Sequence, residues 1–209
     1  MLNINKVNLY LIAIVQFILS FVPQMLYYFF LKSNTITLPL ISLYTLIILF
    51  NLFLSIYLFK KATGRFISIK NIKLKQVLSY IILGFSINTI FGLLTLLFNS
   101  NLPENQQAAM AMSNKLPFWL FFLFGVISGP ILEELFSRGF LIGVIFKNNQ
   151  LFGCLFSVIL FTLLHRPSNI GQALIYLGPA VSLTAIFYVS KKVEYSIIFH
   201  MVINLISIL

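Results

Sequence analysis

Seven apolar stretches, each long enough to cross a lipid bilayer as a helix, occupy most of this chain. A spanning helix needs about 17–25 residues at a rise of 1.5 Å per residue. Apolar residues make up 60% of the sequence and charged residues 9%, whereas a soluble domain carries about 25% charged residues. The chain therefore has too few polar side chains to cover a surface in water. The sequence predicts an all-α fold, a polytopic transmembrane helical bundle of about seven helices. We expect the spans near residues 7–31, 36–59, 76–98, 117–146, 148–166, 171–190 and 193–209.

We expect the bundle to form a single transmembrane domain over residues 1–209. Within it, the helices of residues 1–98 support those of residues 117–209, where the chemically informative residues lie. The polar segment Asn99–Lys115 is expected to be the largest external loop, a flexible connection.

The distribution of basic residues predicts how the chain sits in its membrane. The linker Lys60–Lys75 carries six basic residues and no acidic one, which is typical of a cytoplasmic loop. Alternating spans then place the N-terminus and Lys6, Lys147, Lys191 and Lys192 in the cytoplasm as well. The net charge of +10 belongs to such loops, so we expect membrane lipids and no nucleic acid as partners. Short loops and abundant Lys, Asn, Ile and Phe favour a bacterial plasma membrane.

The few titratable residues are concentrated inside apolar stretches. Of four acidic residues, Glu133 and Glu134 are adjacent within the fourth stretch, and both histidines, His165 and His200, also lie in apolar stretches. A buried charge costs at least about 2.5–3.5 kcal/mol in a membrane. This pattern indicates a polar site within the membrane, and the alternative is a set of structural bonds between helices.

Helical spacing assigns different roles to the two glutamates. Arg138 follows Glu134 by four residues, the favourable spacing for an ion pair on one helix face. Glu133 points about 100° away from Glu134 and has no partner in the local sequence. We therefore expect Glu134–Arg138 to be a structural pair and Glu133 to face a cavity as a free carboxylate, suited to a general base.

Two further pairs at the same spacing lie on later stretches. Phe161 and His165 share one helix face, and His200 and Asn204 share another. A ring nitrogen beside an amide can donate hydrogen bonds to a developing oxyanion. Each pair alone is also compatible with a core histidine or an asparagine that joins two helices.

These motifs resemble those of a known family. Glu133-Glu134-x-x-x-Arg138, Phe161-x-x-x-His165 and His200-x-x-x-Asn204, in this order over residues 117–209, look like the CAAX protease and bacteriocin-processing (CPBP, or Abi) intramembrane proteases, relatives of the type II CAAX prenyl endopeptidase. The resemblance implies that Glu133 and His165 activate the attacking water and that His200 and Asn204 line the oxyanion site. Glu134 and Arg138 would fix the motif helix. The implied substrate is a small peptide or a membrane-associated protein, cut during peptide maturation or bacteriocin self-immunity.

The cofactor requirement has two readings. Family members are often labelled metalloproteases, and Glu133, His165 and His200 could hold zinc with one open position. However, no His-Glu-x-x-His motif occurs, and Asn204 stands where a further histidine would help. We therefore expect no cofactor, with zinc as the alternative.

Other classes of function also fit part of this pattern. A non-catalytic immunity or binding module could use the same bundle, and a proton-coupled transporter would also bury Glu and His. An aspartyl protease is excluded because the sequence contains no aspartate. On straight helices, His200 is expected to lie well below His165, nearer to the cytoplasm, which fits poorly with a shared site.

Overall fold

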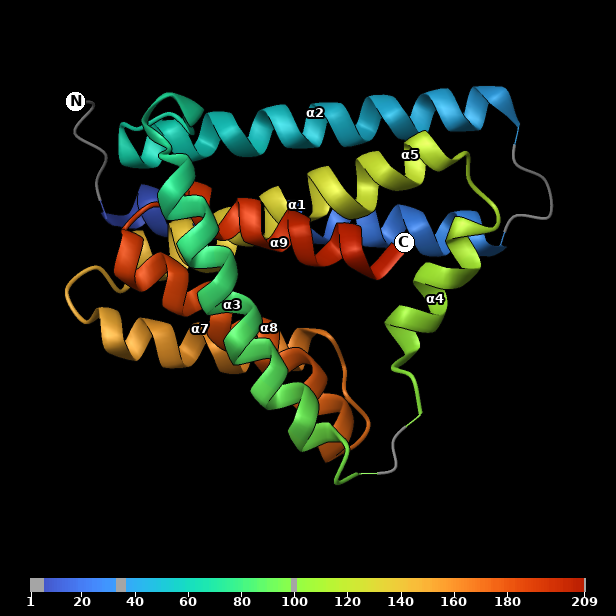
Figure 1. Ribbon diagram of the computed structural model, residues 1–209. Coiled ribbons are helices and arrows are strands. Elements are labelled where there is room, and N and C mark those ends of the chain that lie inside the picture. The colour runs from blue at the N-terminus through green and yellow to red at the C-terminus, as the bar shows by residue number, and fades with distance from the viewer. Residues whose placement is uncertain (1–5, 33–36, 99–100, 209) are drawn as a thin grey trace.

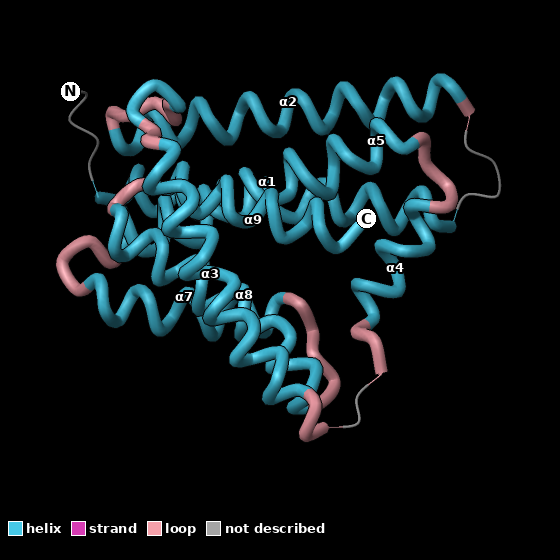
Figure 2. The backbone as a smooth tube through the Cα atoms, viewed as in Figure 1, coloured by secondary structure: helices cyan, strands magenta, loops and turns pink. Residues whose placement is uncertain are grey.

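The computed structural model describes residues 6–32, 37–98 and 101–208, and the regular elements in this part of the chain are all helices (Figures 1 and 2). Each of the seven apolar stretches is helical, so the predicted helical membrane bundle is confirmed. The helices are α1 (Lys6–Lys32), α2 (Leu38–Thr63), α3 (Leu74–Thr95), α4 (Glu104–Ser113), α5 (Phe118–Phe122), α6 (Gly129–Glu134), α7 (Gln150–Leu164), α8 (Ile170–Ser190) and α9 (Val193–Ile208), with η1 (Ile69–Asn71), η2 (Leu123–Ser128) and η3 (Leu135–Ile145) between them.

Five of these stretches are long and apolar enough to cross a membrane, and two are shorter than expected. The five are Val7–Leu26, α2, α3, the continuous helix Phe118–Ile145 and α8. α7 has 15 residues and α9 has 16, which gives each a length of about 22–24 Å. α7 ends at Leu164, with His165 as its C-cap, because Arg166 takes a left-handed conformation (φ 53°) and Pro167 follows.

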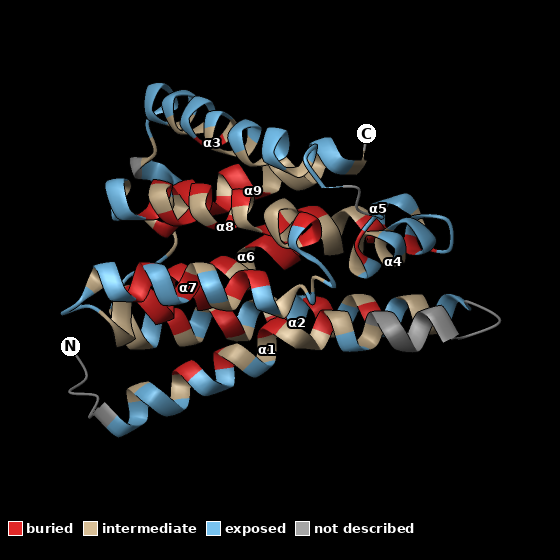
Figure 3. Cartoon of the chain, turned by 90° about the horizontal axis from the view of Figure 1, so that it is seen from below, coloured by how far each residue is buried: buried red, intermediate tan, exposed pale blue. Residues whose placement is uncertain are grey.

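The helix Phe118–Ile145 lies at the centre of the bundle. Figure 3 shows that buried residues concentrate on its middle part and on α8 and α9. α3, by contrast, presents exposed apolar side chains such as Leu78, Ile82, Ile90 and Leu93. A face of this kind is suited to lipid and not to water, so the chain is a multi-pass membrane protein.

The basic connections gather at one end of the bundle. Residues 64–73, 146–149 and 191–192 lie at the same end as the start of α1 (Figure 2). This arrangement agrees with the common location that the sequence predicts for these basic residues. Which side of the membrane this end faces stays a prediction.

α3 packs closely on α9 at one glycine. A Cβ atom at Gly84 would lie 2.2 Å from Cζ of Phe199 and 2.3 Å from its Cε1, so the ring occupies the space that a side chain would need. Phe199 is itself buried, and it precedes His200. The contact thus joins a supporting helix to a motif-bearing one.

Two π-helical segments, which have wider turns than an α-helix, flank α6, the segment that carries the glutamates. η2 and η3 are π-helical, so the N–H of Gly129 donates to the carbonyl of Phe124, five residues earlier. In this register the next amide would pair with the carbonyl of Gly125, but residue 130 is proline and has no N–H. Wide turns of this kind are rare and occur often at functional sites.

The connection before the central helix differs from the expectation. The sequence predicted a flexible loop over Asn99–Lys115, but Glu104–Ser113 forms α4. Pro103 immediately precedes this helix and Glu104 lies in its first turn, two features that favour a helix start. Asn99 and Ser100 lie outside the described residues.

Candidate active site

A buried ion pair fixes the central helix to its neighbours. Arg138 Nη1 lies 2.8 Å from Glu134 Oε1, and both side chains have 0% exposure, so the pair expected from the spacing is present. Arg138 Nη2 also donates to the carbonyl of Ala180 at 3.0 Å and to Oγ1 of Thr184 at 3.2 Å. These bonds hold η3 against α8.

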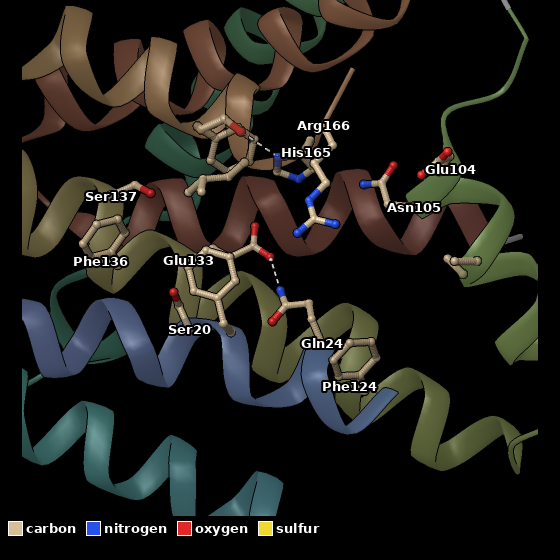
Figure 4. A pocket seen from close by; sticks show the side chains of 15 residues that line it. Ser20, Gln24, Glu104, Asn105, Phe124, Glu133, Phe136, Ser137, His165 and Arg166 are labelled. Atoms are coloured by element: carbon tan, nitrogen blue, oxygen red, sulfur yellow. Dashed lines mark hydrogen bonds between the residues drawn. The ribbon is translucent and has the colours of Figure 1, made fainter. Parts of the chain in front are cut away.

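Glu133 points away from this pair into a cavity of about 260 Å³ (Figure 4). Its side chain is 23% exposed, in contrast to the fully buried Glu134. The amide of Gln24 lies 3.4 Å from Glu133 Oε1 and donates to it in one of its two orientations. In the other orientation the amide donates to the carbonyl of Ser20. Glu133 is therefore the carboxylate that a substrate or a water molecule could reach.

His165 lines the same cavity from the C-terminal end of α7 (Figure 4). Its Nδ1 lies 2.7 Å from the carbonyl of Phe161. A carbonyl can only accept, so the hydrogen resides on Nδ1 and the neutral ring keeps a lone pair on Nε2. The ring lies between Phe161 and Tyr176, with centroids 4.5 Å from each. The position and tautomer of His165 are thus both defined by its neighbours.

His200 lies between the two glutamates. Its Nδ1 is 3.0 Å from Glu134 Oε1, and its Nε2 is 3.9 Å from Glu133 Oε2. The expectation that His200 lies far below His165 is wrong, since the rings of both histidines contact Phe161, at 4.5 and 6.0 Å. Residue counts along α7 and α9 therefore do not give the relative depths of the two rings.

Asn204 contacts the wide turn of the central helix. Its Nδ2 donates to the carbonyl of Gly125 at 2.8 Å, which is the carbonyl that Pro130 leaves without an amide partner. Neither His200 nor Asn204 is among the residues that line the cavity. In the described structure, their donors serve the carboxylate of Glu134 and the carbonyl of Gly125.

Several cavity residues were not predicted from the sequence. Gln24 comes from α1, Glu104 and Asn105 come from α4, and Arg166 directly follows His165. Tyr176 of α8 stacks on His165 and donates a hydrogen bond to Asn105. The pairing of Pro103 with Glu104 could have indicated α4, but nothing in the sequence placed that helix beside His165.

The residues of the zinc alternative do not form a cluster of metal ligands in the described structure. No group of three or more His, Cys, Asp or Glu side chains in residues 6–32, 37–98 and 101–208 is arranged to hold a metal ion. His200 directs Nδ1 at Glu134, and the amide of Asn204 is bonded to a carbonyl. The expectation of no cofactor and its zinc alternative both stay predictions.

Fold and site together define a multi-pass helical membrane protein in which a carboxylate and an imidazole share one cavity. Residues 115–206 match the family model described as type II CAAX prenyl endopeptidase Rce1-like. The chain is also 30% identical over 173 residues to the UPF0177 protein YbdI of Lactococcus lactis subsp. lactis (strain IL1403), covering 79% of this chain and 93% of that protein. The chain belongs to this Rce1-like, CPBP-type family, a family of proteases, which confirms the resemblance of its motifs. No solved structure matches the chain.

Proposed function

We propose that this protein is an intramembrane endopeptidase that hydrolyses a peptide bond in a small peptide or a membrane-associated protein. One observation carries the proposal: Glu133 and His165, from separate helices, line the same cavity. The Nε2 lone pair of His165 has no hydrogen-bond partner among the described residues. Membership of a protease family supports the reaction class.

The mechanism begins with a water molecule between Glu133 and His165. Glu133 and His165 act together as the general base: one proton leaves the water for this pair, and the resulting hydroxide attacks the carbonyl carbon of the substrate. The pair then delivers this proton to the leaving nitrogen, so the C–N bond breaks and a carboxylic acid and an amine result. Glu134 does not react in this scheme, because Arg138 and His200 already hold it.

The tetrahedral intermediate needs hydrogen-bond donors for its oxyanion. We assign this role to His200 and Asn204. His200 has the closer placement, since its Nε2 lies 3.9 Å from Glu133. Because Nδ1 already faces the carboxylate of Glu134, this role requires the imidazolium form of His200, which carries a hydrogen on both ring nitrogens. Asn204 donates one amide hydrogen to Gly125, and an amide carries a second hydrogen that can serve the oxyanion when substrate is bound.

We also propose the cofactor requirement, the membrane and the substrates of this enzyme. The enzyme acts without a cofactor, in a bacterial plasma membrane, with its N-terminus in the cytoplasm. Its substrates are peptides processed during maturation or bacteriocin self-immunity, because bacteria in general lack prenylated CAAX proteins.

The test compares wild type with Glu133→Gln, purified in detergent or liposomes, on a library of quenched peptides. We expect cleavage to fall at least about a hundredfold in the variant, with unchanged thermal unfolding. Glu104→Gln is the matched control, because Glu104 lines the same cavity from α4 and has no role in the mechanism. A parallel series with a chelator tests zinc, and loss of wild-type cleavage there would restore the metal alternative.

Two outcomes would contradict the catalytic assignment. One is equal cleavage by wild type and Glu133→Gln. If the library contains no substrate, the same variants are compared for protection of cells against a bacteriocin. The other contradicting outcome is protection that survives Glu133→Gln, which indicates a non-catalytic immunity module.

A further inference from the structure

A second cavity, of about 880 Å³, lies at the end of the bundle where the basic connections gather. It shares no lining residue with the candidate active site. The end of α2 with the residues after it, η3 with Lys147 after it, and the turn between α8 and α9 form most of its lining. Leu9 of α1 and Gln150 of α7 complete it.

Positive charge dominates the lining of this cavity. Arg65, Lys147, Lys191 and Lys192 line it, and Glu194 is the one acidic residue among the residues that do so. Glu194 already accepts a hydrogen bond from the N–H of Ser68 at 3.2 Å. Cations gathered in one hollow repel one another, and an anion in the hollow would relieve this repulsion.

Two of these cations are available for a ligand. The side chains of Arg65 and Lys147 are exposed, and neither forms an ion pair or a hydrogen bond with the described residues. Their charges are therefore not neutralised within the cavity. A guanidinium and an ammonium are both suited to binding phosphate oxygens.

Lys191 has an unusual backbone conformation at the rim. Its φ of 54° lies in the left-handed region, where it ends α8. Glycine is the usual residue at such a position, and a lysine there is strained. The lysine side chain lies on the ring of Tyr188 and donates to Oε1 of Gln150 at 2.6 Å, so the ammonium is held beside the cavity.

Part of the cavity wall is apolar. Leu9, Phe59, Val144 and Phe187 contribute to it, and α1, α2 and α8, which carry three of these residues, also have exposed apolar side chains. A ligand with both an anionic head and an apolar tail matches this lining better than a small inorganic anion. Basic pockets between transmembrane helices are known to bind such head groups.

We propose that this cavity binds the phosphate head group of an anionic phospholipid. Arg65, Lys147 and Lys191 contact the phosphate, and the acyl chains leave along the apolar wall. The sequence alone predicted membrane lipids as partners of the chain with its basic loops. The structure adds cations from two other connections and gives them a shared cavity.

The test uses the full chain in a nonionic detergent and measures bound lipid by native mass spectrometry. Phosphatidylglycerol, phosphatidylcholine with the same acyl chains, and inorganic phosphate are titrated separately. We expect phosphatidylglycerol to bind at least about tenfold more tightly than phosphatidylcholine. The triple variant Arg65→Gln/Lys147→Gln/Lys191→Gln should lose roughly a hundredfold in affinity for phosphatidylglycerol.

A charge-matched control separates the cavity from the surface around it. Lys70→Gln/Lys73→Gln/Lys75→Gln removes the same charge from nearby exposed positions that do not line the cavity, and we expect its affinity to change less than about threefold. If the cavity triple variant does not fold, Lys147→Gln alone should weaken binding about fivefold.

Three results would overturn the proposal. Equal binding of the two lipids would remove the role of the anionic head group. An equal loss in the control variant would assign the effect to general surface charge. Saturable binding of inorganic phosphate that displaces phosphatidylglycerol with similar affinity would identify a soluble phosphate ligand. None of these readouts depends on proteolysis, so they are independent of the proposed function.

Discussion

The imidazole of His165 stacks on the phenol ring of Tyr176, with centroids 4.5 Å apart and ring planes 30° apart. The hydroxyl of Tyr176 donates in turn to Asn105 of α4. A residue of α8 thus connects the proposed general base to the helix that covers one side of the cavity. The stacked ring and the carbonyl of Phe161 together hold His165 in one orientation.

This stacking predicts different effects for two substitutions of Tyr176. Tyr176→Leu removes the ring, so His165 is less well placed, and we expect kcat to fall about tenfold. Tyr176→Phe keeps the ring and loses only the bond to Asn105, so kcat should stay within about threefold. Tyr188→Leu, an exposed position on the same helix, serves as the control. Full activity of Tyr176→Leu would contradict a positioning role.

The ion pair between Glu134 and Arg138 predicts a large loss of stability when it is broken. Arg138→Met leaves Glu134 buried without its cation, which should lower the free energy of unfolding by about 3–5 kcal/mol. The measurement is denaturant unfolding in mixed micelles. The double variant Glu134→Met/Arg138→Met should lose less than Arg138→Met alone, because no uncompensated charge remains. An equal or larger loss in the double variant would show that the pair is not the cause.

The contact of Gly84 with Phe199 predicts that alanine at two glycines of α3 changes the free energy of unfolding differently. Gly84→Ala forces a buried ring to move, and we expect a loss of about 1–3 kcal/mol in the free energy of unfolding. Gly92→Ala meets nothing within 4 Å and should be neutral or stabilising by up to about 1 kcal/mol. Thermal unfolding in detergent compares them. Similar melting temperatures for both variants would argue against close packing at Gly84.

The bond from Asn204 to Gly125 predicts coupling with Pro130. Asn204→Leu leaves the Gly125 carbonyl unpaired and should cost about 1 kcal/mol of stability. Pro130→Ala restores an N–H in the register of the wide turn, so it can donate to that carbonyl. The loss caused by Asn204→Leu should therefore be smaller when Pro130→Ala is present. A double-mutant cycle measures this coupling, and strictly additive effects would contradict it.

Local spacing predicted a large part of this molecule. The seven apolar stretches are helices because their length and composition leave no other way to satisfy the backbone in lipid. The Glu134–Arg138 pair and the divergent direction of Glu133 followed from the geometry of a single helix. Each of these features depends on residues within a few turns of one another.

The features that sequence reasoning missed depend on contacts between distant segments. His200 reaches the glutamates because α9 packs against α6, which no residue count along one helix reveals. Asn204 contacts Gly125 because Pro130 removes an amide in a wide turn, and the sequence does not specify that turn. α4 and Asn101 before it are bonded to α8, more than seventy residues further along the chain.

The wide turn at Leu123–Ser128 has a consequence for comparing this chain with its relatives. A π-helical turn accommodates one residue more than an α-helical turn. A relative that lacks this residue could form a regular helix with the same start and end, and its carboxylate equivalent to Glu133 would still face the cavity. A correct alignment of such a relative would have a one-residue gap before Gly129, in the middle of a membrane helix, where gaps are usually treated as errors.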